Sequence, residues 1–185
     1  MATKLRINAN CSSVAKASKH PPINFFYSHF HNSIRNELDM LSQSMSELSS
    51  ASQEKIHGRL TILKNRYRFL EQVYKYHSSV EDEVVYPTLD SKVKNVTSAY
   101  SVEHEDEERL FEQLSALLSA ALQQEGKARM ATLRQLECKI EEVHTTLRKH
   151  LAKEEEQLFP LLLKHFSFAE QASSSIESAV AMPAL

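Results

Sequence analysis

One sequence motif occurs twice in this chain, and it limits the folds that the sequence can adopt. In each copy a glutamate follows a histidine by four residues, and an aromatic residue, a proline and a leucine follow at nine, ten and twelve residues. Residues four apart lie on one face of an α-helix, one turn from each other. Each copy therefore predicts a helix that presents an imidazole and a carboxylate together. The two copies are His77, Glu81, Tyr86, Pro87 and Leu89, and His150, Glu154, Phe159, Pro160 and Leu162.

Hydrophobic periodicity predicts four long helices. Apolar residues recur at alternating spacings of three and four, which is the pattern of a helix with one buried face. In the second helix this row ends at Val84, and in the fourth it ends at Leu161; Pro160 should kink the fourth helix or end it early. The breaks between the patterns are short, so consecutive helices should be antiparallel neighbours in an all-α, up-down-up-down four-helix bundle. The expected helices cover residues 22–49, 54–86, 93–124 and 127–166.

Histidine and glutamate interrupt the apolar faces of these helices. One histidine falls in the row of core residues in each helix, and in three helices a glutamate lies beside it. Burying unpaired imidazoles and carboxylates is costly, and a cation that they share removes that cost. We therefore predict a metal site at the centre of the bundle. Its candidate ligands are His31, His77, Glu81, His104, Glu107, His150 and Glu154.

Two residues of this set have competitors close by in the sequence. His31 shares its helix face with apolar residues, whereas His29 shares its face with polar residues, so His31 is the preferred candidate. Glu107 continues the apolar row of the third helix and is preferred over Glu108. The competing interpretation is that the run 103–108 forms a solvated acidic face.

A second spacing, Glu-x-x-His, is the one that ferritin-like di-iron proteins use. The chain contains it at Glu54 and His57 and again at Glu141 and His144. Both pairs fall outside the apolar rows of their helices. We therefore interpret them as surface pairs.

The candidate ligands are imidazoles and carboxylates without thiolates, a set that suits iron or manganese better than structural zinc. Glu81 and Glu154 lie on different helices, so either can bridge two metal ions. We expect two iron ions, Fe²⁺ or Fe³⁺, with an oxo or hydroxo bridge and one open position for O₂.

The stretches around these residues resemble hemerythrin-like (HHE cation-binding) domains, among them the N-terminal domains of plant BRUTUS-type iron-regulatory zinc-finger/RING ubiquitin ligases. The resemblance implies a di-iron centre held by six of the candidates, without Glu107. Oxygen-carrying hemerythrins have a further histidine where this chain has Glu108, so the resemblance favours iron binding or sensing over reversible oxygen carriage. The matching strings are FHNSIRNELDML, RYRFLEQVYKYHSSVEDEVVYPTLDSKVKNVTSAYSVEHEDEERLFEQL and HLAKEEEQLFPLLLKHFSFAEQAS, within residues 21–173.

We expect an iron-binding domain that senses iron, oxygen or both in iron homeostasis and signals to an unidentified protein partner. One alternative is a di-iron enzyme that acts on O₂, peroxide or Fe²⁺. The other is a metal-free helical module that binds a partner through its acidic segment 103–108. Two cysteines cannot build the zinc sites of a RING, so we do not expect this chain itself to transfer ubiquitin.

Composition excludes several other classes. Lys and Arg number 22 against 24 Asp and Glu, and no apolar run approaches 18 residues, so we expect neither nucleic-acid binding nor a membrane span. Cys11 and Cys138 lie in unlike contexts and are expected to be free thiols in the cytoplasm or nucleus. Residues 1–20 are expected to be a disordered leader with a weak likeness to a transit peptide, 21–172 the domain, and 173–185 a flexible tail.

Overall fold

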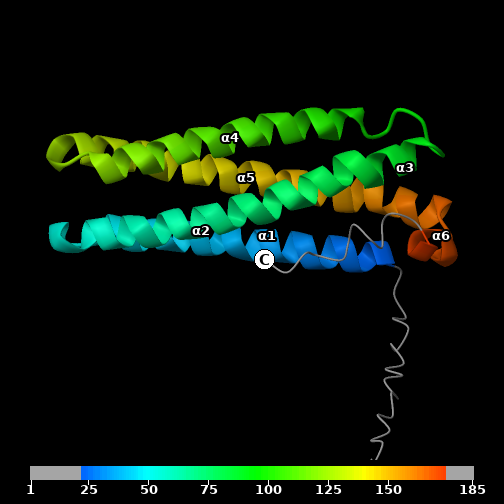
Figure 1. Ribbon diagram of the computed structural model, residues 1–185, viewed down its shortest axis with the longest axis horizontal. Coiled ribbons are helices and arrows are strands. Elements are labelled where there is room, and N and C mark those ends of the chain that lie inside the picture. Colours follow the sequence, from blue (N-terminus) through cyan, green and yellow to red (C-terminus); the bar gives the residue numbers. More distant parts are fainter. Residues whose placement is uncertain (1–21, 174–185) are drawn as a thin grey trace, which may run out of the picture.

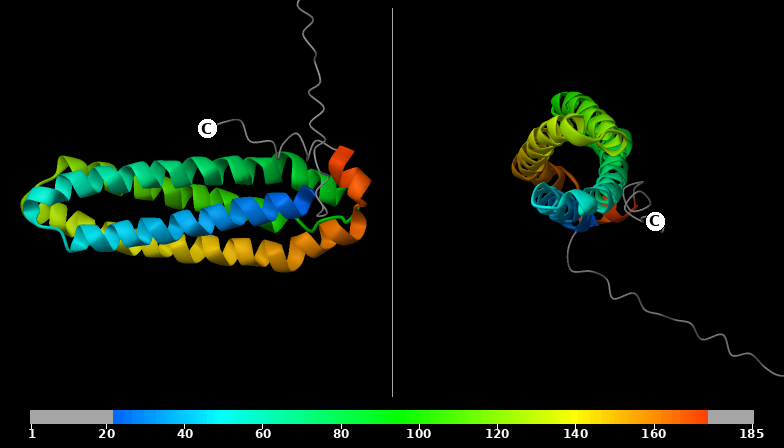
Figure 2. Two further views of the ribbon diagram at one scale, coloured as in Figure 1. Left: turned by 90° about the horizontal axis from the view of Figure 1, so that it is seen from below. Right: turned by 90° about the vertical axis from the view of Figure 1, so that its left-hand side faces the viewer.

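The computed structural model describes residues 22–173, which form an elongated bundle of antiparallel helices (Figure 1). Seen end on, the long helices surround a common axis (Figure 2). This confirms the predicted all-α four-helix bundle, and no strand occurs within residues 22–173. The elements are α1 (Pro22–Ser49), α2 (Gln53–Val80), the π-helical turn η1 (Glu81–Val85), α3 (Tyr86–Asp90), α4 (Ser98–Gln123), α5 (Gly126–His165) and α6 (Phe168–Ser173).

Some predictions concern residues outside this range, and the structure bears on others only in part. The expected leader, the tail beyond residue 173 and Cys11 lie outside the described residues. Cys138 is a free, exposed cysteine. None of the helices within residues 22–173 is long and apolar enough to cross a membrane.

The continuous helix made of α2, η1 and α3 contains a π turn that the sequence analysis did not predict. Pro87 has no N–H to donate, and its ring crowds the carbonyl of Glu83 four residues earlier. In η1 the N–H of Tyr86 bonds to the carbonyl of Glu81, five residues back. This wider turn accommodates the proline within a helix that continues to Asp90.

The π turn shifts the buried face by one residue. Val84 was predicted to be in the core, but it is only half-buried, whereas Val85 is buried. The extra residue in the turn rotates everything that follows. In α5 the helix does not end at Pro160 but continues to His165, and its last turns bend (Figure 2). There Leu162 takes the buried position predicted for Leu161.

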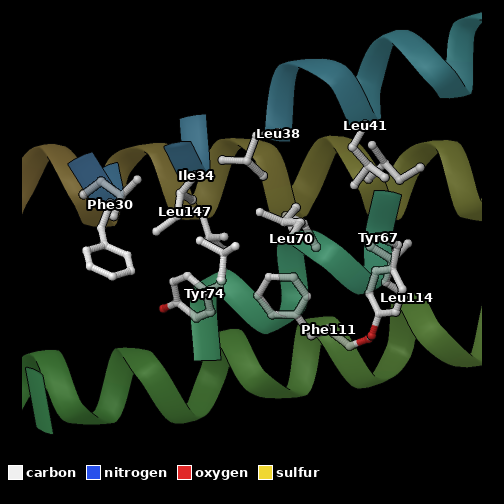
Figure 3. Close-up of a cluster of buried hydrophobic side chains, with 14 of the residues drawn as sticks. Phe30, Ile34, Leu38, Leu41, Tyr67, Leu70, Tyr74, Phe111, Leu114 and Leu147 are labelled. Atoms are coloured by element: carbon white, nitrogen blue, oxygen red, sulfur yellow. The ribbon is translucent and has the colours of Figure 1, made fainter. Parts of the chain in front are cut away.

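An apolar core runs along the bundle from the α1–α2 and α4–α5 turns to the end that carries α3. All four long helices contribute side chains that interdigitate about the bundle axis (Figure 3). The buried hydroxyl of Tyr67 lies in this region, and it donates a hydrogen bond of 2.9 Å to the carbonyl of Phe111. The buried histidines and glutamates lie beyond Tyr74, toward the end that carries α3 and α6 (Figure 1).

The core predicts unequal effects for two neighbouring residues of α2. Leu63 is 0% exposed and Ile62 is 49% exposed. We expect Leu63→Ala to lower the free energy of unfolding by about 2–5 kcal/mol, since it leaves a cavity in a packed interior. The matched change Ile62→Ala should cost about 0.5 kcal/mol or less. Urea unfolding followed by circular dichroism measures both, and equal losses would contradict this orientation of α2.

Candidate metal centre

Each long helix delivers one buried histidine to the same region of the bundle, and two buried glutamates lie between them. These residues form two overlapping groups, in each of which one ligand atom per residue lies within 4.8 Å of the others. The first group is His31, His77, Glu81 and Glu154, and the second is Glu81, His104, His150 and Glu154. We call the six residues the central cluster, and the two groups the His31–His77 position and the His104–His150 position.

Glu154 faces both positions with different oxygens. Its Oε2 lies 3.3 Å from Nε2 of His31 and 4.0 Å from Nε2 of His77. Its Oε1 lies 3.4 Å from Nε2 of His150. The two oxygens of this carboxylate can therefore contact two cations.

Glu81 joins the two positions through one oxygen. Its Oε2 lies 3.2 Å from Nε2 of His77 and 3.5 Å from Nε2 of His104. Within the second position, the Nε2 atoms of His104 and His150 are 3.1 Å apart. Each pair of histidines therefore aims its Nε2 atoms at the same two carboxylates.

Several atoms of the cluster lack the hydrogen bonds that buried polar groups normally make. Within residues 22–173, Nε2 of His31, both oxygens of Glu81 and Oε2 of Glu154 are buried without a well-formed hydrogen bond, although Nε2 of His31 and Oε2 of Glu154 lie 3.3 Å apart. A buried polar atom left in this way costs about 1–3 kcal/mol. A cation supplies the missing partner to all of them at once, and imidazole nitrogens with carboxylate oxygens suit a transition metal. The residues present therefore fit a metal ion.

The two carboxyl groups differ in their acidity. Burial, reinforced by the nearby charge of Glu154, raises the pKa of Glu81 well above its ordinary value. Burial would also raise the pKa of Glu154, but hydrogen bonds with His150 and His31 outweigh it and hold that pKa well below its ordinary value. Without a cation, the surroundings of Glu81 therefore favour its protonated form and those of Glu154 favour its ionised form.

The histidines four residues before Glu154 and Glu81, which are His150 and His77, also differ in their pKa values. Burial lowers the pKa of His150, but its hydrogen bond with Glu154 prevails and raises that pKa to about 9. Burial lowers the pKa of His77 well below its ordinary value, and the adjacent His31 adds to the effect. Metal ligands bind in their deprotonated forms, so a cation at this site displaces the protons of Glu81 and His150.

Outer carboxylates hold three of the four histidine rings. Each accepts a hydrogen bond from Nδ1, which leaves the Nε2 lone pair directed at the central cluster. Partners of this kind fix the ring orientation and tautomer of metal-binding histidines. The pairs are His31 with Glu155 (2.8 Å), His104 with Asp82 (2.9 Å) and His150 with Glu103 (3.1 Å).

The sequence analysis missed the outer carboxylates, although two of them directly follow the glutamate of the repeat. Asp82 comes after Glu81, and Glu155 comes after Glu154. Each binds the histidine of a neighbouring helix rather than that of its own. Glu155 is held in turn by Arg35, whose guanidinium donates to both carboxylate oxygens at 2.8 and 2.9 Å.

Six of the seven predicted residues belong to the central cluster, and Glu107 does not. Glu107 is buried, as predicted, but its Oε2 accepts a hydrogen bond from the hydroxyl of Tyr74. Its Oε1 lies 3.6 Å from Nδ1 of His150, on the side of that ring away from Nε2. Burial raises the pKa of Glu107. Its ligation of a metal stays a prediction.

The rejected candidates lie at the surface. His29 is exposed, and Glu108 is exposed and lies 3.4 Å from the ammonium of Lys75. In the pair Glu54 and His57, both residues are exposed. In the other Glu-x-x-His pair, Glu141 is exposed and His144 lies 2.9 Å from Asp39.

A surface pocket of about 290 Å³ reaches the cluster beside the His104–His150 position. The ring of His150 and the carboxylate of Glu107 form part of its wall. Nearer the surface, the ammonium of Lys153 pairs with Glu103. The pocket therefore lies on the side of His150 where Glu103 and Glu107 contact Nδ1, next to the His104–His150 position.

Comparison with known proteins gives one family and several relatives. The family model described as "Hemerythrin HHE cation binding domain" matches residues 25–173. Zinc finger protein BRUTUS of Arabidopsis thaliana is 39% identical over 143 residues, which are 77% of this chain and 11% of that protein. Two BRUTUS-like zinc finger proteins of the same plant are 38% and 34% identical over 80% and 90% of this chain. The chain spans only 11–13% of the length of these relatives.

The outer carboxylate Glu155 predicts a pH dependence of stability. Its hydrogen bond with His31, supported by that with Arg35, lowers the pKa of Glu155 from 4.5 to about 2. A pKa that is lower in the folded state stabilises the fold above the ordinary value, and this contribution is lost as the pH falls toward about 2. In metal-free protein, Glu155→Gln should therefore lower the free energy of unfolding most near neutral pH and least near pH 2.

Urea unfolding in the presence of a chelator, repeated across this pH range, measures the effect. Glu156→Gln is the matched control, because Glu156 is the exposed neighbour on the same helix. A difference between parent and Glu155→Gln that does not change with pH would show that Glu155 does not make this ion pair in solution.

Proposed function

The chain belongs to the Hemerythrin HHE cation binding domain family, and from this premise we propose that it holds a non-haem di-iron centre that senses iron, oxygen or both. One observation carries the proposal: two groups of four buried ligands share the carboxylates of Glu81 and Glu154. Two cations that share bridging carboxylates are the arrangement that such overlapping groups favour.

The ligand set supports iron as the metal. In the proposed centre His31 and His77 would hold one ion, His104 and His150 would hold the other, and Glu81 and Glu154 would serve both. The absence of thiolates from the central cluster argues against a structural zinc site. Iron bound in this way can exist in ferrous and ferric states, which makes the site responsive to oxygen as well as to iron.

The proposed signal is the stability of the half of the bundle that contains the cluster. A metal bound only by the folded state stabilises that state, so its loss weakens the packing around Glu81, Glu154 and their histidines. An unidentified protein partner in the cytoplasm or nucleus then reads the change. The relatives named zinc finger proteins are far longer than this chain, so their other activities are not assigned to it.

The pocket beside His150 favours a second candidate function, in which the iron centre turns over O₂, peroxide or Fe²⁺. Repeated turnover in stopped-flow mixing with these substrates would support an enzyme. Reaction in a single round would support the sensor.

The proposal predicts the metal content of the protein. After anaerobic loading with Fe²⁺ and desalting, we expect about two iron ions per chain by plasma mass spectrometry. The double variant His77→Ala/Glu81→Ala should retain fewer than half, because it removes a ligand of one position and a carboxylate shared by both. Glu54→Ala/His57→Ala is the matched control, since it removes the same residue types from the surface of the same helix. Equal iron in both double variants would refute the site.

Iron should also stabilise the fold. Free iron at about 100 times its dissociation constant adds about 2.7 kcal/mol to the free energy of unfolding. For a chain of this size we expect the thermal midpoint to rise by about 5–10 °C. The variant His77→Ala/Glu81→Ala should show little or no rise. Differential scanning calorimetry with iron and with chelator measures the shift, and a midpoint that ignores iron would exclude the proposed signal.

A further inference from the structure

The His31–His77 and His104–His150 positions have corresponding residues around them. They differ at the aromatic residue of the repeat, which is Phe159 in one copy and Tyr86 in the other. Tyr27 precedes His31 by four residues, and Tyr100 precedes His104 by four. The aromatic residue of each repeat packs against one of these tyrosines. The ring centroids of Phe159 and Tyr27 are 5.5 Å apart, and those of Tyr86 and Tyr100 are 6.1 Å apart. In this position one half therefore has a phenyl ring and the other has a phenol.

The hydroxyl of Tyr86 lies among the ligand atoms of the His104–His150 position. It donates a hydrogen bond to Oε1 of Glu154, the oxygen that also faces His150. It lies 3.5 Å from Nε2 of His104. The Tyr86 ring stacks on the His104 ring with a centroid distance of 5.6 Å and an angle of 13°, which fixes the hydroxyl in this place.

We propose that Tyr86 is a further oxygen ligand of the metal ion held by His104 and His150. This inference rests on the proposed function, because it presupposes iron at that position. On coordination the phenol O–H bond breaks, its proton leaves to solvent, and the oxygen donates its electron pair to the metal. The repeat supplies no such oxygen at the His31–His77 position, because Phe159 takes the corresponding place. The two iron ions are therefore chemically different.

Other buried tyrosines do not share this position, and they supply controls. The hydroxyl of Tyr100 donates to Gln157 at 2.9 Å, and that of Tyr67 donates to the carbonyl of Phe111. Tyr27 lies near Glu81, which both positions share, so it is a competing phenol and its variant is part of the test.

Visible spectroscopy of the iron-loaded protein tests the proposal. A phenolate bound to Fe³⁺ gives a charge-transfer absorption band in the visible range, and resonance Raman excitation in that band shows tyrosinate ring vibrations. After air oxidation we expect both signatures in the parent protein. Tyr86→Phe should lose them while it keeps the parent's iron content and helical circular dichroism. Tyr67→Phe and Tyr27→Phe should keep them.

Each outcome decides one question. An iron-loaded parent without tyrosinate vibrations overturns the proposal, whether or not the variants fold. A band that survives in Tyr86→Phe, or is lost in Tyr27→Phe instead, also overturns it. A parent that retains no iron refutes the di-iron function itself, so failure of the function and failure of the Tyr86 assignment give different results.

Discussion

Burial of ionisable side chains at the centre of the bundle is the constraint on which the rest of the structure depends. Glu81 and Glu154 are fully buried, and four imidazoles surround them. Charged groups in such a place must neutralise one another or bind a cation. The pKa values of the two carboxyl groups shift in opposite directions, which favours a proton on Glu81 and a negative charge on Glu154 beside His150. The same balance makes the cluster a good host for a cation.

The apolar core and the central cluster share the bundle. Buried apolar side chains line it from the α1–α2 and α4–α5 turns to the end that carries α3, and the half that contains the cluster also buries ionisable groups. In that half, hydrogen bonds also cross between helices, such as those that Asp82 accepts from α4 and Glu155 accepts from α1. Local stability differs along a structure in this way, and the less stable part is the one that a ligand can control.

The sequence predicted the four-helix bundle and the members of the central cluster because both depend on spacing within single helices. A histidine and a glutamate four residues apart must share a face, whatever the helix packs against. The outer carboxylates could not be found in this way, since Asp82 and Glu155 serve histidines on other helices. The π turn could not be predicted either, because periodicity does not show whether an N–H near Pro87 bonds to the carbonyl four or five residues back. Periodicity predicted that Glu107 is buried, but it could not say that its carboxylate contacts Tyr74 and the Nδ1 side of His150 instead of the Nε2 atoms.

Glu154, near the end of the last long helix, belongs to both groups of ligands. During synthesis on the ribosome, α1, α2 and α4 leave the exit tunnel before α5. Neither position is complete until the chain has been made past this residue. The helices made before it carry His31, His77, Glu81 and His104, but they lack one of the two carboxylates that both groups share. Completion of both groups therefore coincides with the docking of α5 against the helices made before it.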